Sequence, residues 1–144
     1  MELTFQQISQ IIPWAFSTTA IIVSISVYRK NRAVNVYSNL DAMYMDLLKL
    51  SIENPSFIDP SRTKDYQSGF KDDDLRRYGQ YANIAWNICE TIVDRKDDKK
   101  NFETWKPVLL FESQLHKSWF EDESNQIKFK QRFRNYVRDS ILID

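Results

Sequence analysis

The stretch from Leu3 to Tyr28 carries no charged side chain, and the basic run Arg29-Lys30-Asn31-Arg32 follows it directly. This pattern is typical of one membrane-spanning helix with a cytoplasmic anchor. Its densest apolar part, Ile11 to Tyr28, spans about 27 Å at roughly 1.5 Å per residue, close to a hydrocarbon core of about 30 Å. We therefore predict a transmembrane anchor at residues 1–31, in contact with the lipid bilayer, and a cytosolic domain at residues 32–144.

Two other interpretations of this stretch stay open. A cleaved signal peptide requires basic residues before the apolar run and small residues at a cleavage site, whereas this chain begins Met-Glu and leaves the stretch with Tyr-Arg-Lys. The second interpretation is that the stretch forms the assembly core of a soluble helical bundle. Hydroxyl side chains such as Ser17, Thr18 and Thr19 favour it, because they make the stretch less apolar. Since cations follow the stretch and none precede it, the membrane interpretation places the C-terminal domain in the cytoplasm.

Small and polar residues recur along the stretch at steps of four and three. They are Gln6, Gln10, Pro13, Ser17, Ala20 and Ser24. On a helix this spacing puts them on one seam, and small residues at a seam allow neighbouring helices to approach closely. We therefore expect a homo-oligomer in which Gln10, Ser17, Ala20 and Ser24 face the neighbouring copies.

The composition of the chain favours an all-α fold. Glycine occurs only twice and proline four times in 144 residues, which is too few turn residues for a sheet-rich fold. The formal net charge is zero, so there is no general basic field for double-stranded nucleic acid. The single cysteine, Cys89, excludes an internal disulfide and suits a reducing cytosol.

Apolar periodicity predicts two helices in the first part of the cytosolic domain. One long helix continues from the membrane to about Glu53, where Asn54-Pro55 ends it. Residues 55–70 are predicted to form a loop, because they contain two prolines and scattered polar residues. The run Asp72-Asp73-Asp74 then places negative charge at the start of the next helix.

The second part of the domain is predicted to contain two more helices. One follows the charged loop 94–100, is capped near Asn101 or Thr104, and tolerates Pro107 only in its first turn. The last helix covers about 125–142. The residues expected in the core of this bundle are Trp86, Ile88, Trp105, Trp119 and Phe133.

The sequence shows no catalytic signature. It contains no glycine-rich phosphate loop, no H-E-x-x-H and no C-x-x-C motif. His116, the only histidine, is expected on the surface or satisfied in the core, and Cys89 is expected to be an inert core residue. The three aspartates from Asp72 are explained more simply by a helix start than by a metal site. We therefore predict no enzymatic activity, no cofactor and no bound metal.

The last predicted helix carries Lys130, Arg134 and Arg138 at strict four-residue steps. Such a row of cations suits phosphates or anionic lipid headgroups. The alternative is pairing within the chain, because Glu90 and Asp94 lie on a polar stripe of the second helix of the domain. In an oligomer each copy contributes its own row, so we predict that these three cations bind a nucleotide-like or other polyanionic ligand across subunits.

Several short motifs, spread over most of the chain, resemble those of a group of bacterial proteins. They are Tyr44-x-x-Leu47, Glu53-Asn54-Pro55, Trp86-Asn87-x-x-Glu90, Trp105, Phe133 and Tyr136. The group consists of uncharacterised small membrane proteins with one N-terminal transmembrane helix and a helical cytosolic domain. The resemblance implies a location in the bacterial inner membrane, but it carries over no functional residue. The layout is also similar to that of small membrane effectors of bacterial antiviral systems.

We therefore expect a single-pass membrane effector. Its cytosolic domain is expected to sense an anionic ligand and to couple binding, through the long first helix, to an oligomeric membrane segment with a pore-like role. The alternative is a passive membrane-tethered adaptor that presents a helical surface to a protein partner. Ligand-dependent leakage of a membrane would distinguish the first from the second.

Overall fold

The computed structural model describes the backbone of residues 5–142 and the side chains of residues 20–28, 31 and 38–142. Within residues 5–142 the chain is helical and contains no β-strand, which confirms the predicted all-α fold. The elements are α1 (Phe5–Glu53), the 3-10 helix η1 (Pro55–Ile58), α2 (Pro60–Thr63), α3 (Tyr66–Gly69), α4 (Asp72–Val93), α5 (Lys99–Leu115), α6 (Lys117–Glu121), α7 (Glu123–Gln126) and α8 (Gln131–Ser140).

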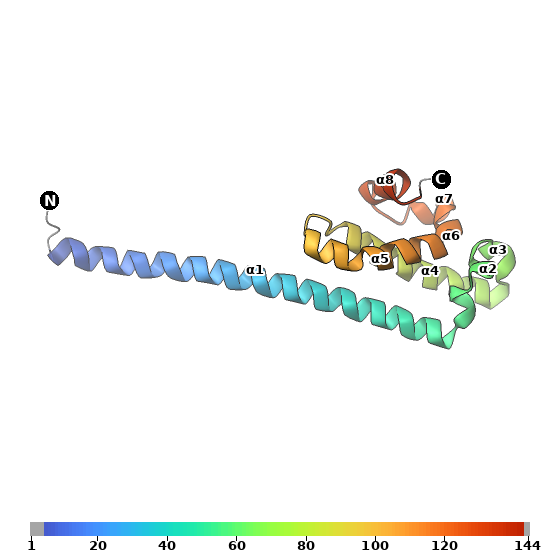
Figure 1. Cartoon of the computed structure of the whole chain (residues 1–144), viewed down its shortest axis with the longest axis horizontal. Helices are drawn as coiled ribbons and strands as arrows, with labels where there is room; N and C mark the ends of the chain where they lie inside the picture. The colour runs from blue at the N-terminus through green and yellow to red at the C-terminus, as the bar shows by residue number, and fades with distance from the viewer. Residues whose placement is uncertain (1–4, 143–144) are drawn as a thin grey trace. The chain divides into compact units, whose positions relative to one another are not determined.

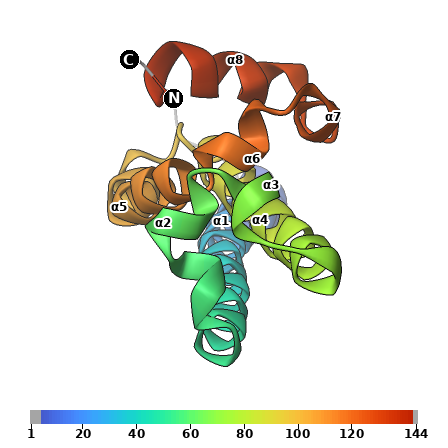
Figure 2. The same cartoon turned by 90° about the vertical axis from the view of Figure 1, so that its right-hand side faces the viewer.

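The chain divides into two compact units, Met1–Asn39 and Leu40–Asp144. In the second unit the two long helices α4 and α5 lie side by side, and the short helices α6 and α7 lead from α5 to α8 (Figures 1 and 2). The last turns of α1 belong to this unit, because Leu40 and Leu47 are buried in its core.

The predicted location in the bacterial inner membrane is wrong. Among the residues that the structure describes, no helix has a stretch both long enough and apolar enough to cross a bilayer. The described residues therefore do not support the predicted single-pass anchor.

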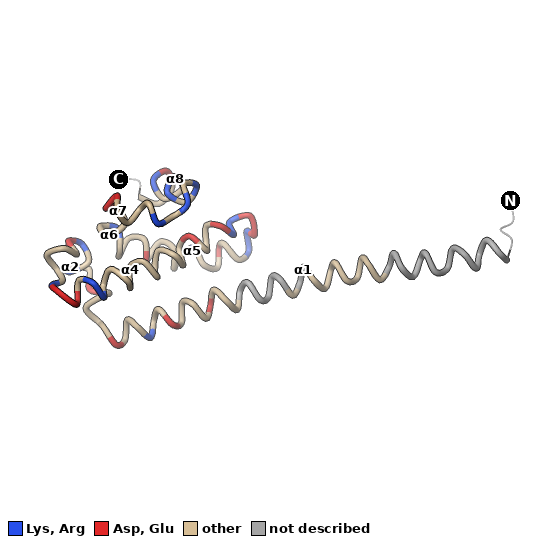
Figure 3. The backbone as a smooth tube through the Cα atoms, turned by 180° about the vertical axis from the view of Figure 1, so that it is seen from behind, with Lys and Arg blue, Asp and Glu red and all other residues tan. Residues whose placement is uncertain are grey.

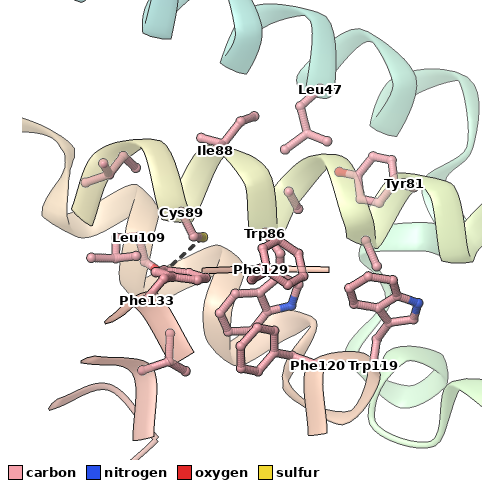
Figure 4. Packing of buried hydrophobic residues seen from close by; sticks show 14 of the residues in the cluster. Leu47, Tyr81, Trp86, Ile88, Cys89, Leu109, Trp119, Phe120, Phe129 and Phe133 are labelled. Atoms are coloured by element: carbon pink, nitrogen blue, oxygen red, sulfur yellow. Dashed lines mark hydrogen bonds between the residues drawn. The ribbon is translucent and has the colours of Figure 1, made fainter. Parts of the chain in front are cut away.

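The core of the second unit is built mainly from aromatic rings. Trp86 stacks on Phe120 with ring centroids 4.0 Å apart, and Phe133 meets the edge of Trp86 at 6.1 Å (Figure 4). All five side chains predicted for the core are buried. Cys89 is also fully buried, its thiol points to the carbonyl of Leu109, and burial raises the pKa of this thiol well above its ordinary value. Its prediction as a core residue is confirmed.

The first helix ends where the sequence predicts, but the following loop is more ordered than expected. α1 stops at Glu53, and the side-chain amide of Asn54 donates a hydrogen bond of 3.0 Å to the carbonyl of Leu50. Residues 55–70 contain η1, α2 and α3 and not a plain loop. The reason is burial, because Phe57 and Phe70 pack against Tyr78 of α4, and this anchoring holds the short helical turns in place.

α5 begins earlier than predicted and continues through its proline. The side chain of Asp98 accepts a hydrogen bond from the backbone nitrogen of Asn101, so the helix is capped at Asp98. Pro107 therefore lies inside the helix and not in its first turn. A proline there removes one backbone hydrogen bond. The buried side chains of Trp105 and Leu109 on either side hold this segment against the core in spite of that loss.

Candidate functional site

The predicted last helix is broken just before the row of basic residues. Lys130 is not inside a helix but at the N-cap of α8, with φ −60° and ψ 142°. Its backbone nitrogen donates a hydrogen bond of 2.9 Å to a carboxylate oxygen of Glu90, and its ammonium group lies 2.6 Å from Asp94. Tertiary contacts to α4 thus set the start of α8, and Lys130 does not continue the helical row of Arg134 and Arg138.

Asp94, at the C-terminal end of α4, receives two cations from the segment around Lys130. Its two carboxylate oxygens each lie 2.6 Å from a cation, one from Lys130 and one from Arg132. Burial raises the pKa of Asp94, but the hydrogen bonds and charges of Lys130 and Arg132 outweigh it and hold this pKa below its ordinary value. This contact ties α8 to α4.

The depressed pKa of Asp94 predicts an acid-sensitive contribution to stability. A carboxyl whose pKa is lower in the folded state stabilises the fold above its unfolded pKa, and this contribution is lost as the pH falls through the folded value. We expect Asp94→Asn to cost up to about 1 kcal/mol at pH 7, and the difference from wild type to disappear well below about pH 4. Urea unfolding at pH 7 and at low pH measures this. Asp46→Asn, at an exposed pair with Lys49, is the matched control, and an equal loss at both pH values for Asp94→Asn would contradict the assignment.

Arg134 and Arg138 lie together at a cavity of about 370 Å³ on the second unit. Its apolar wall comes from Phe120, Val137 and Leu142. Its polar wall comes from Glu121, Gln126, Gln131 and the two arginines. Two of the three cations predicted to bind a ligand therefore line one cavity, whereas Lys130 is held against Asp94 and does not line it. Figure 3 shows basic residues, in blue, along α8.

The two arginines of this cavity have few acidic partners. Arg134 donates a hydrogen bond to the neutral amide oxygen of Gln131, and it forms no ion pair with any residue described. Its Nε atom is buried and has no hydrogen-bond partner in the described part of the chain. Arg138 donates to Asp139 at 3.0 Å and to Asn135 at 3.2 Å. A guanidinium with a buried N–H group that has no acceptor can donate a hydrogen bond to an anion.

A second hollow, of about 480 Å³, lies between the end of α1 and the start of α4. Its apolar lining includes Leu50, Ile84 and Tyr81. Two arginines line it as well, but both are engaged, since Arg76 pairs with Asp73 at 2.6 Å and Arg77 donates to Asn54 at 2.5 Å. This groove is therefore mostly apolar, with its cations already partnered.

The sequence analysis did not predict a cluster of buried polar side chains in the second unit. His116 is fully buried at the end of α5, and its Nδ1 lies 2.9 Å from the hydroxyl of Tyr78. Its Nε2 lies 3.5 Å from a carboxylate oxygen of Glu112, which is too long for a hydrogen bond, and neither atom has another hydrogen-bond partner among the described residues. Burial, and then the charge of Glu112, raise the pKa of both Tyr44 and Tyr81. The only sequence signal for this cluster was the four-residue spacing from Glu112 to His116.

The remaining site predictions fall partly outside the structure. Of the predicted seam, Ala20 and Ser24 are exposed, while the side chains of Gln10 and Ser17 lie outside the described residues. Within the part of the chain described with side chains, no three metal-binding residues come together.

No protein-family model, curated protein sequence or solved structure matches this chain. The resemblance to small bacterial membrane proteins and to antiviral effectors therefore stays a prediction. Any function proposed for this chain must rest on its own geometry and chemistry.

Proposed function

We propose that the second unit is a binding domain for a small anionic ligand and has no enzymatic activity. The observation that carries the proposal is Arg134, whose Nε atom is buried without a partner beside a cavity that Arg138 also lines. A buried donor without an acceptor costs about 1–3 kcal/mol, and a carboxylate or phosphate oxygen would remove this cost. A cavity of this size suits a small molecule better than a polymer.

The lining of the cavity narrows the ligand class. Two guanidinium groups favour a ligand with one carboxylate or phosphate group, because a planar fork of donors matches such oxygens in pairs. Glu121, which also lines the cavity, disfavours further negative charge nearby. Its carboxylate is partly neutralised by Lys117 at 3.7 Å. Gln126 and Gln131 offer amide groups to a neutral polar part of the ligand. A mononucleotide-like anion fits this description better than a highly charged polyanion.

Calorimetric titration of the full chain with inorganic phosphate, adenosine monophosphate and adenosine tests the proposal. We expect the anions to bind and uncharged adenosine to bind at least tenfold more weakly. Arg134→Gln should weaken anion binding by about 10- to 100-fold, because a hydrogen bond to a charged group is worth about 1.5–3 kcal/mol. The matched control is Arg132→Gln, which removes the same charge at an exposed position outside the cavity.

The outcomes distinguish specific anion binding in the cavity from non-specific electrostatic attraction to the protein. Anion binding that is lost in Arg134→Gln and kept in Arg132→Gln supports the cavity. Equal losses in the two variants, or no binding of either anion to the wild-type chain, would reject it. Far-ultraviolet circular dichroism should remain unchanged in both variants, because neither arginine belongs to the apolar core.

A second candidate function is presentation of a helical surface to a protein partner. The groove beside α4 favours it, since Leu50 and Ile84 leave more than a third of their surfaces exposed there. Its cations are already partnered, so this surface would select an apolar and not an acidic partner. Loss of partner binding in Ile84→Asp, with anion binding intact, would separate this function from the first.

A further inference from the structure

The described part of α1 in the first unit exposes large apolar side chains on opposite sides. Six of them between residues 21 and 28 are 47% to 67% exposed: Ile21, Ile22, Val23, Ile25, Val27 and Tyr28. At 3.6 residues per turn, Ile21 and Ile25 share one side of the helix, while Val23 and Val27 share the opposite side. A helix that is apolar on all sides is normally buried on all sides.

The exposed area is too large for an isolated chain. At about 100 Å² for each half-exposed large side chain, the six expose roughly 600 Å² in total around the helix, and an apolar surface of a few hundred Å² is already unusual on a monomer. The area therefore indicates a protein interface.

The absence of charge from this stretch favours the same segment of another copy as its partner. No charge occurs from Leu3 to Tyr28, and Figure 3 shows none in the described residues 20–28. A partner helix must match this length without placing a charge against it, because an unpaired charge is costly to bury. The same segment of a second copy has the same length and also carries no charge, so it meets this condition. The steps of four and three between Ser17, Ala20 and Ser24 also give the period that two like helices need to pack along their length.

We propose that residues 5–28 of α1 assemble with the same segment of other copies into a helical bundle of at least three chains. A pair of helices covers only one side of each helix, so apolar residues on opposite sides require at least two neighbours. Ile22 and Ile25 lie in the interface of this bundle. The bundle does not depend on the anion cavity, which lies in the second unit.

Sedimentation of the purified full chain at micromolar concentrations tests the bundle. We expect the wild-type chain to sediment as a species of three or more copies. Ile22→Glu combined with Ile25→Glu should weaken association at least 100-fold and yield monomers, because it buries charge between the helices. The matched control combines Ile52→Glu with Ile127→Glu, which adds the same charge at isoleucines 76% and 72% exposed in the second unit.

Each outcome decides the proposal. Assembly that is lost in the first double variant and retained in the control supports the bundle. A wild-type chain that is monomeric or dimeric overturns it, including a monomer that instead binds neutral phosphatidylcholine vesicles. Equal effects of the two double variants also overturn it. Tryptophan fluorescence reports whether the second unit stays folded when it is measured in a Trp14→Phe background. The remaining tryptophans, Trp86, Trp105 and Trp119, are all buried in the second unit.

Discussion

Replacing Trp86 by alanine is expected to lower the free energy of unfolding by about 3–5 kcal/mol. The ring is fully buried at the centre of the aromatic core. It stacks on Phe120 and meets Phe133, and its Nε1–H donates a 3.1 Å hydrogen bond to the backbone carbonyl of His116. Alanine removes the apolar surface and leaves a cavity that the facing rings cannot fill. It also leaves the carbonyl of His116 with only its 3.3 Å hydrogen bond from the backbone nitrogen of Phe120.

Urea unfolding of the full chain, followed by circular dichroism, measures this loss. Trp86→Phe separates the two contributions, because phenylalanine keeps most of the ring packing and loses only the indole donor. We expect it to cost clearly less than the alanine variant. Ile127→Ala is the surface control, since that side chain is 72% exposed and such changes stay within about 0.5 kcal/mol. A loss below about 1 kcal/mol for Trp86→Ala would mean that the ring does not anchor the core.

The features predicted correctly from sequence depend on local periodicity. Trp86, Trp105 and Phe133 fall on apolar rows that repeat every three or four residues, and all three are buried. The end of α1 at Glu53 was predictable because Asn54-Pro55 is a local stop signal. Neither feature requires knowledge of which helices touch.

The features predicted wrongly depend on contacts distant in sequence. The helix break before Lys130 exists because its backbone nitrogen bonds Glu90, 40 positions away. The helix through Pro107 persists because buried neighbours hold it against the core. The segment 55–70 is ordered because Phe57 packs on Tyr78 of α4. Local propensity cannot report such tertiary contacts.

Only part of the candidate cavity was predictable from the sequence, because some of its walls depend on contacts distant in sequence. The four-residue step from Arg134 to Arg138 puts both side chains on one side of α8, and the cavity lies there. The other walls come from Phe120 and Glu121 of α6 and from Gln126 of α7, which only the fold brings together. The sequence could therefore identify the cations of the site but not its shape.

The buried pair of His116 and Glu112 is expected to be strongly coupled. Each lies almost fully buried, and the carboxylate approaches the imidazole Nε2 at 3.5 Å. Removing one member leaves the other polar group in an apolar setting, and a buried polar group without a partner costs about 1–3 kcal/mol. We therefore expect His116→Leu and Glu112→Leu each to destabilise the fold by about 1–3 kcal/mol, with urea unfolding as the measurement.

The double variant His116→Leu/Glu112→Leu distinguishes coupling from simple loss of packing. Leucine approximates the volume of both side chains, so the double variant removes both polar groups without a large cavity. We expect it to be more stable than the sum of the single losses predicts, by about 0.5–3 kcal/mol, because neither polar group is then left alone in the apolar core. The hydroxyl of Tyr78 loses its 2.9 Å partner in both His116 variants, so this cost cancels in the comparison. Strictly additive losses would show that the two groups act separately. Non-additive losses would show that the two side chains, which lie one helical turn apart at the end of α5, depend on each other.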